Sequence, residues 1–458
     1  MEQRQIIAIV VIIVIIAAGV GLWLFLPAPY GSVVTGQLVT PGAPAGTPEN
    51  RIIKVGIIND MTEIQGEGAW RGAYLACDEI NTAGGVTIGS DTYYFGIVSE
   101  DTGEAGASPV AATATAAATK LVTDDGAQFA IGGFRTEMVL AYQDIFMDEE
   151  MLFFGSGAST DIFCQNVLDD YDTYKYFFRT MPINSTSLAI SLLSEIVYLQ
   201  AYMGAITGLN ISKVAIIREG LDWTEGMSAF LNGYLPLYGF EIVKEVAYPI
   251  DAEAADFTTY WNQIDAAGAQ IAIPIISAQG GILMTSQYAQ VQPDCLIAGI
   301  DVMAQLDTYW TQTNGACEYE IVLQSTLRTN KTTKTIPFWD SFLSHYGNEP
   351  LYTAIGSYDA MYCLKLGIEE AQSLDSNDII PFLEDHDITD PVEGAGGNIG
   401  WTPSHDLFLG YSGNTIYSAT LFVQWQAGGV HVAISSGEAL YPDWVVTGET
   451  LLPDWWEY

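Results

Sequence analysis

Two short stretches of the sequence place hydroxyl groups and bare backbone directly after apolar runs. They cover residues 128–136 (QFAIGGFRT) and 152–160 (LFFGSGAST), and they include Arg135, Thr136, Gly157 and Ser159. Backbone N–H groups and hydroxyls at the end of a buried strand can donate to a small anion, and a carboxylate suits them. The same residues would also fit ordinary strand-to-helix turns in which Ser and Thr cap helices.

The sequence lacks the common signatures of catalysis and cofactor binding. It contains no GxxxxGK[ST] phosphate loop and no GxSxG nucleophile motif. The glycine clusters at 66–72 and 394–400 fail as dinucleotide fingerprints, because Arg71 and Ile399 stand where a glycine is needed. The four histidines are isolated and there is no CxxC pair. We therefore expect a binding protein, not an enzyme, with no catalytic residue, no metal and no cofactor.

From Arg51 onward, short β-branched runs alternate with longer segments of helical period. The expected strands are 54–58, 93–99, 128–133, 151–155, 213–219, 240–249, 269–277 and 294–301, and the expected helices include 69–81, 108–123, 137–148, 187–203 and 256–265. This alternation predicts parallel sheets covered by helices, and 458 residues exceed what one core supports. The predicted fold class is α/β, with two doubly wound Rossmann-like lobes. Such sheets bind ligands beyond the carboxyl ends of their strands, where both stretches above lie.

The rhythm of strands and helices also predicts the domain organisation. Lobe I is expected over 51–180 with about 328–390 returning to it, lobe II over 181–325 with about 400–435, and an extended tail over 436–458. Three crossover strands, near 179–182, 325–328 and 390–403, would join the lobes as a hinge. Ligand binding would then select a closed state in which both lobes contact the ligand.

The N-terminus contains an uncharged apolar run from Ile6 to Leu26, which is long enough to span a membrane. A cleaved signal peptide usually has a shorter apolar region of about 7–15 residues. We therefore expect residues 1–26 to be a retained membrane anchor with one transmembrane helix. Residues 27–50, rich in Pro, Gly and Thr, are expected to be a flexible linker. The predicted location is the cell surface, with the domain outside the cytoplasmic membrane.

The charge of the chain narrows its partners. The chain has 55 acidic residues and 15 lysines and arginines, which gives a formal net charge of −40, and this charge repels nucleic acid.

Five scattered cysteines do not form a disulfide scaffold. Outside the cell, Cys295 and Cys317 would be the leading candidates for a pair, although the sequence alone does not fix the pairing.

The chain resembles the branched-chain amino-acid (Leu/Ile/Val-type) substrate-binding proteins of ABC transporters. The resemblance spans about 50–440. It is carried in lobe I by 54–85 (KVGIINDMTEIQGEGAWRGAYLACDEINTAGG), 99–134 and 152–160, in lobe II by 214–226 (VAIIREGLDWTEG), 266–277 and 295–301, and later by 354–371. It implies a type I periplasmic-binding-protein fold, a small amino acid or related carboxylate as ligand, and docking on an ABC permease in the membrane.

The resemblance also implies roles for individual residues. Thr136, Ser159 and the Gly157 backbone would hold the carboxylate and ammonium, Trp223 would close over the ligand, Ser277 would lie at the third strand end of lobe II, and Asp301 would face the ammonium. Three departures count against a plain leucine-type ligand: Gln65, Ser277 and the added cation of Arg135. Alternatives stay open, since Trp223 could be core, Arg135 could pair with Glu137 or another acid, and Asp301 could be an N-cap.

These observations predict a membrane-anchored solute-binding protein that delivers its ligand to an ABC importer. A ligand-sensing ectodomain is an alternative, although it would need a partner kinase. A structural cell-surface protein that reuses the fold is another. It would fit the acidity, and it would show a blocked cleft in place of polar donors.

Overall fold

The computed structural model describes residues 29–106, 109–277, 280–325 and 327–456. Residues 29–32 belong to a separate N-terminal unit and form a turn in which the Ser32 N–H donates to the Pro29 carbonyl. From Val33 onward the chain forms one compact unit, which contains two sheets. The predicted transmembrane helix over 6–26 lies outside the described residues.

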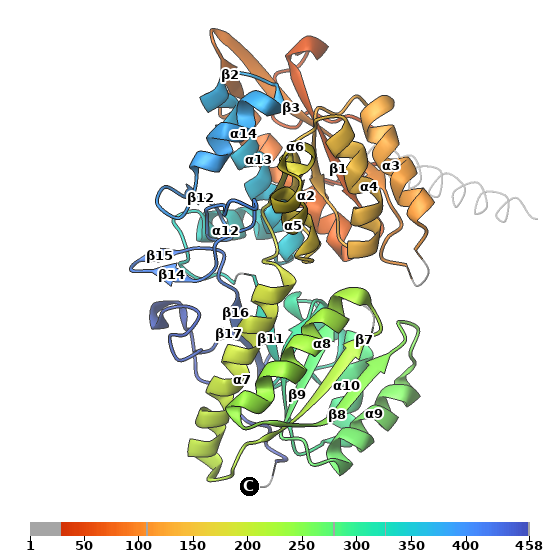
Figure 1. Ribbon diagram of the computed structural model, residues 1–458, viewed down its shortest axis with the longest axis vertical. Helices are drawn as coiled ribbons and strands as arrows, with labels where there is room; N and C mark the ends of the chain where they lie inside the picture. The colour runs from red at the N-terminus through yellow and green to blue at the C-terminus, as the bar shows by residue number, and fades with distance from the viewer. Residues whose placement is uncertain (1–28, 107–108, 278–279, 326, 457–458) are drawn as a thin grey trace, which may run out of the picture. The chain divides into compact units, whose positions relative to one another are not determined.

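Lobe I is built on a six-stranded sheet of order β2-β3-β1-β4-β5-β6 (Figure 1). Its strands are β1 (Ile52–Asn59), β2 (Val86–Ile88), β3 (Asp91–Asp101), β4 (Phe129–Gly132), β5 (Phe153–Gly155) and β6 (Phe177–Arg179). Its first helices are α2 (Ile64–Thr82), α3 (Ala111–Thr123), α4 (Thr136–Asp148), α5 (Ile162–Asp169) and α6 (Tyr171–Tyr174). All strand pairs are parallel except β2 with β3. The order β3-β1-β4-β5-β6 is that of a doubly wound sheet whose strand order reverses between β1 and β4.

Lobe II repeats this design in a seven-stranded sheet of order β17-β16-β11-β10-β9-β7-β8. Its strands are β7 (Lys213–Glu219), β8 (Glu241–Tyr248), β9 (Ile271–Ile276), β10 (Leu296–Asp301), β11 (Ile321–Gln324), β16 (Leu421–Gln426) and β17 (Val430–Ala433). Its helices are α7 (Ser185–Thr207), α8 (Asp222–Tyr234), α9 (Ala254–Ala266), α10 (Gly281–Val291) and the short α11 (Tyr309–Gln312). The strand order reverses between β7 and β9, and the two antiparallel pairs of this sheet are β11 with β16 and β16 with β17.

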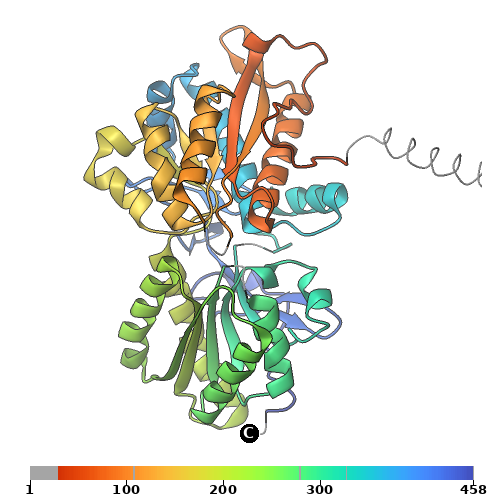
Figure 2. The same cartoon turned by 90° about the vertical axis from the view of Figure 1, so that its right-hand side faces the viewer.

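Helices cover both faces of each sheet, as the two orthogonal views show (Figure 1, Figure 2). The returning segment adds α12 (Thr335–Tyr346), α13 (Tyr352–Ala371) and α14 (Ser376–Asp385) to lobe I, where α13 packs beside α2. The strands are buried because their β-branched and aromatic residues face helices on both sides; every residue of β4, β5 and β9 is buried.

The chain passes between the lobes after β6, after β11 and between α14 and β16. The last passage carries two short hairpins, β12 (Val392–Glu393) with β13 (Asn398–Ile399) and β14 (Tyr411–Ser412) with β15 (Thr415–Ile416). Buried Lys331 links the second and third passages, because its Nζ donates to the carbonyls of Ser325, Gly396 and Ala419 at 2.6–2.8 Å. Burial lowers the pKa of Lys331 to about 7.

Two local expectations differ from the structure. Residues from Val34 onward were expected to be a flexible linker, yet they lie against β3: the Ser99 hydroxyl donates to the Val34 carbonyl, and Val39 and Ile97 exchange backbone hydrogen bonds. The edge of β3 supplies the backbone partners that a free linker would lack. The expected Cys295–Cys317 pair is wrong, because both thiols are free and lie in separate core clusters of lobe II.

The tail from Ser436 packs on lobe II. Tyr441 is buried and its hydroxyl donates to the Ile434 carbonyl, while the Trp455 Nε1–H donates to the Pro293 carbonyl. Among the described residues one helix, α7, passes the length and composition test for a membrane span; 44% of its apolar window is buried inside the protein.

Candidate functional site

A cavity that is partly open to solvent lies at the carboxyl ends of both sheets, and the space in and in front of it, open solvent included, is about 610 Å³. Lobe I contributes residues that follow β4 and β5, and lobe II contributes residues at the ends of β7, β9, β10 and β11. The sixteen lining residues are Phe134, Arg135, Thr136, Gly157, Ser159, Pro182, Leu188, Leu221, Trp223, Ser277, Ile300, Val302, Gln305, Leu323, Ser325 and Tyr352. Six of the eight predicted site residues are among them; Gln65 and Asp301 are not.

Glycines allow the two lobe I loops to touch. A Cβ on Gly157 would lie 2.0 Å from the Gly133 carbonyl oxygen, so no other residue fits there without moving the loop. The Ser156 N–H donates to the Gly132 carbonyl at 3.2 Å, and Gly133 has a φ of +83°, which favours glycine. This close approach is the physical reason for the bare backbone of LFFGSGAST, and it brings Thr136 and Ser159 to one cavity.

Arg135 is the only cationic residue among those that line the cavity, and it is only 4% exposed. Its guanidinium donates to two neutral carbonyls, those of Gly106 at 2.8 Å and Ala105 at 3.3 Å. Within the described chain it forms no ion pair with Glu137 or another acid. The carboxylate of Glu104 accepts from the Arg135 backbone N–H at 3.0 Å, and burial raises the pKa of Glu104 to about 7. Among the described residues the guanidinium therefore contacts carbonyl oxygens and no carboxylate.

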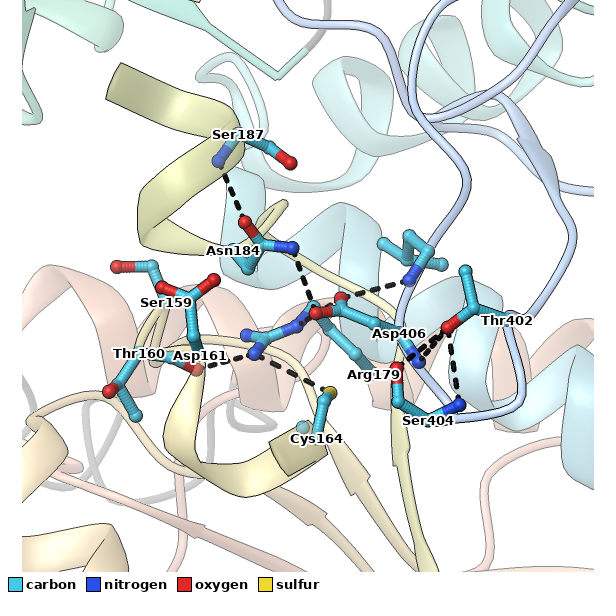
Figure 3. Close-up of polar contacts among 12 residues, drawn as sticks. Ser159, Thr160, Asp161, Cys164, Arg179, Asn184, Ser187, Thr402, Ser404 and Asp406 are labelled. Carbon is cyan, nitrogen blue, oxygen red and sulfur yellow. Dashed lines mark hydrogen bonds and ion pairs between the residues drawn. The ribbon is translucent and has the colours of Figure 1, made fainter. Parts of the chain in front are cut away.

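A buried ion pair holds the loop that carries Ser159 (Figure 3). The Arg179 Nη1 and Nη2 donate to the carbonyls of Ala158 and Thr160, on either side of Ser159, at 2.7 and 2.6 Å. The Arg179 Nε donates to the Asp406 carboxylate at 2.8 Å, and the Asn184 side chain donates to the same carboxylate at 2.9 Å. Arg179 ends β6, directly before the first passage between the lobes, and Asp406 lies between α14 and β16, in the third passage. The loop that carries Ser159 is therefore fixed to two of the segments that join the lobes.

The lobe II residues of the cavity are mostly apolar. Trp223 lies in the first turn of α8, half-buried, and its buried Nε1–H has no acceptor among the described residues. Ser277 lines the cavity, but its N–H and hydroxyl both donate to one oxygen of buried Glu219, at 2.9 and 2.6 Å. Its carbonyl accepts from the Gln65 side chain at 3.3 Å, so Gln65 joins the two lobes beside the cavity.

Asp301 does not face the cavity, which corrects its expected contact with a ligand ammonium. Its side chain is fully buried, and its Oδ1 accepts from the N–H groups of Met303 and Ala304 at the start of the short helix η3 (Met303–Gln305). Its Oδ2 accepts from the Tyr309 hydroxyl at 2.9 Å. Asp301 therefore accepts from the first turn of η3, much as the capping alternative expected, although the N-cap residue itself is Val302, and burial raises the pKa of the Asp301 carboxyl.

Several cavity residues escaped the sequence reasoning. Tyr352 begins α13, and its hydroxyl donates to the Gly157 carbonyl at 3.4 Å across 195 positions of sequence. Gln305, Ser325, Pro182 and Leu188 follow strand or crossover ends. The crossover positions were the available signal, since residues flanking a hinge lie beside the cleft that it closes.

A comparison with protein families matches residues 52–428 to the periplasmic binding protein model. The chain belongs to the periplasmic binding protein family. The match confirms the predicted α/β type I fold with parallel sheets. No curated protein sequence matches this periplasmic binding protein.

Solved structures of ABC-transporter substrate-binding proteins share its fold. The leucine-binding protein LivK of Thermotoga maritima is 17% identical, with a TM-score of 0.68, over 85% of this chain and 99% of that one. LivJ of Streptococcus pneumoniae in complex with isoleucine is 17% identical (TM-score 0.65; 83% and 97% covered). A solute-binding protein of R. palustris in complex with benzoate is 14% identical (TM-score 0.65; 83% and 95% covered). These neighbours confirm the resemblance to branched-chain amino-acid binding proteins, and at such low identity they establish the fold alone.

Proposed function

We propose that this periplasmic binding protein captures a small carboxylate in the interlobe cavity and delivers it to an ABC importer. The observation that carries the proposal is the buried guanidinium of Arg135, which lines a cavity between two lobes without an acid partner among the described residues. The hydroxyls of Thr136 and Ser159 line the same cavity. Charge-assisted hydrogen bonds from such donors are the usual way in which proteins hold a carboxylate.

The open cavity favours ligand capture over a purely structural role, since a structural protein would have no need for polar donors in an accessible cleft. The fold neighbours bind isoleucine and benzoate, which are both small carboxylates. The 21 uncharged residues from Ile6 to Leu26 support anchoring in the cytoplasmic membrane, with the binding domain outside. In that location the closed protein would present its ligand to an ABC permease in the same membrane.

Isothermal titration of the full-length protein in detergent tests the proposal. The panel contains aliphatic and aromatic α-amino acids, their amides, and aliphatic and aromatic monocarboxylates. We expect heat from at least one carboxylate and none from the matched amide. Absence of heat and of thermal stabilisation across the whole panel would contradict the proposed function.

A further inference from the structure

Among the described residues that line it, the cavity contains one cation and no acid. Of its sixteen lining residues, Arg135 carries a positive charge and none carries a carboxylate. The protein as a whole has the opposite balance, with 55 acids against 15 bases. The cavity therefore differs in charge from the rest of the chain, and this difference bears on which carboxylates it can hold.

The strand-end acids that could face a ligand ammonium are already occupied. Glu219 ends β7 and Asp301 ends β10, and both are fully buried. One Glu219 oxygen accepts both donors of Ser277, while Asp301 accepts from two backbone N–H groups and from Tyr309. Neither acid lines the cavity, so an ammonium there would lie near Arg135 without a counter-charge.

A buried charge without a partner costs free energy, and a second cation nearby raises that cost further. An anion beside Arg135 lowers that cost, whereas the ammonium of an α-amino acid adds to it. The remaining surface suits an uncharged body. The lobe II wall of the cavity is formed by the ring of Trp223 and by the apolar side chains of Leu221, Ile300, Val302 and Leu323. The Trp223 Nε1–H has no acceptor among the described residues and can donate to a ligand.

From this geometry we infer that the ligand is a monocarboxylate with an apolar body and no amino group. This inference rests on the proposed function and narrows it, because it excludes the α-amino acids that the proposal still allows. Arg135 is the residue that decides this specificity, and the walls of lobe II accept the body of the ligand.

Matched pairs of ligands that differ only by the amine test the inference. We would titrate 3-phenylpropanoate against phenylalanine, and 4-methylpentanoate against leucine, with benzoate as a rigid reference. The acid without the amine should bind at least about 10-fold more tightly in each pair, which is the size expected when one buried charge lacks its partner. If phenylalanine or leucine binds as well as its amine-free partner, the inference is overturned and the proposed function stands. If no ligand binds, both are overturned.

Variants assign the effect to the charge of the cavity. Arg135→Met should weaken binding of the amine-free acids by about 100-fold, and Arg135→Lys, which keeps the charge, by less. Arg51→Met is the matched control, since Arg51 pairs with Asp91 outside the cavity and the crossovers. Gln305→Glu adds an acid to the cavity wall and should narrow the difference within each pair. An unchanged difference in Gln305→Glu, together with normal binding by Arg135→Met, would overturn the role of Arg135.

Discussion

The two halves of the cavity are built on the same strand order, yet they present opposite chemistry. In lobe I, the loops after β4 and β5 expose hydroxyls and a guanidinium, held in place by the buried pair of Arg179 and Asp406. In lobe II, the acids at the strand ends point into the protein, and mostly apolar side chains face the cavity. One half can bind the charged end of a ligand and the other can cover its body. The topology thus provides the position of the site, while the side chains at the strand ends determine its chemistry.

Removal of Arg179 should produce the largest loss of stability, because the Arg179 side chain holds the loop after β5 that carries Ser159. Arg179→Met leaves Asp406 buried without its partner, and we expect a loss of about 3–5 kcal/mol in the free energy of unfolding. Urea unfolding measures this loss. The double variant Arg179→Met with Asp406→Leu should recover part of the stability, because no charge is then left unpaired. Equal stability of Arg179→Met and the wild type would show that the pair does not support the loop.

The second prediction concerns Glu104, which accepts from the Arg135 backbone N–H and interacts electrostatically with Asp60, Tyr142 and Tyr352. Its folded pKa of about 7 exceeds its ordinary value of 4.5, so the folded state binds more protons between these pH values. Stability therefore falls as the pH rises through this window, by at most about 3 kcal/mol.

Melting temperatures at pH 5 and pH 8 test this sign. The wild type should lose more stability between the two pH values than Glu104→Gln, whose amide keeps an acceptor for the Arg135 N–H and does not ionise. Parallel pH profiles for the two proteins would mean that Glu104 keeps an ordinary pKa.

Truncation of Trp223 tests the apolar half. Trp223→Ala removes a half-buried ring from the cavity wall, and we expect ligand affinity to fall by about 10- to 100-fold, since the burial of such a ring contributes about 1.5–3 kcal/mol. The melting temperature of the ligand-free protein should change little. Trp444→Ala is a suitable control, because Trp444 is 47% exposed and lies outside the cavity. A large loss of stability without loss of affinity would identify Trp223 as a core residue.

The smallest effect on binding should come from Asp301. Asp301→Asn keeps an acceptor for the N–H groups of Met303 and Ala304, and we expect ligand affinity within about 2-fold of the wild type, well below the effect of one charge-assisted hydrogen bond. Titration with the best carboxylate of the panel measures it. A 10-fold loss of ligand affinity would show that Asp301 contributes to the ligand site, and the lobe II half of the cavity would then not be mostly apolar in function.

The sequence by itself determined the strands, their parallel arrangement and the loops that form the site. Runs such as VGII (55–58) and FAIGG (129–133) are buried, and their helix-period neighbours leave few alternatives to a doubly wound sheet. The Gly-rich end of LFFGSGAST likewise marked a close approach of two backbones, because only glycine accepts the contact between Gly157 and Gly133. These features depend on local pattern, which is why they could be predicted.

Only the tertiary structure decided where the charged side chains point. Asp301 follows a strand in the position of a ligand contact, but Tyr309 and the turn of η3 hold its carboxylate inside lobe II. Arg135 could have paired with Glu137 on the next turn of chain, but its guanidinium contacts carbonyls 29 and 30 positions earlier. Tyr352 reaches Gly157 only because the chain returns to lobe I after its second crossover. Contacts between distant segments depend on packing and not on sequence spacing, so no local pattern could have indicated them.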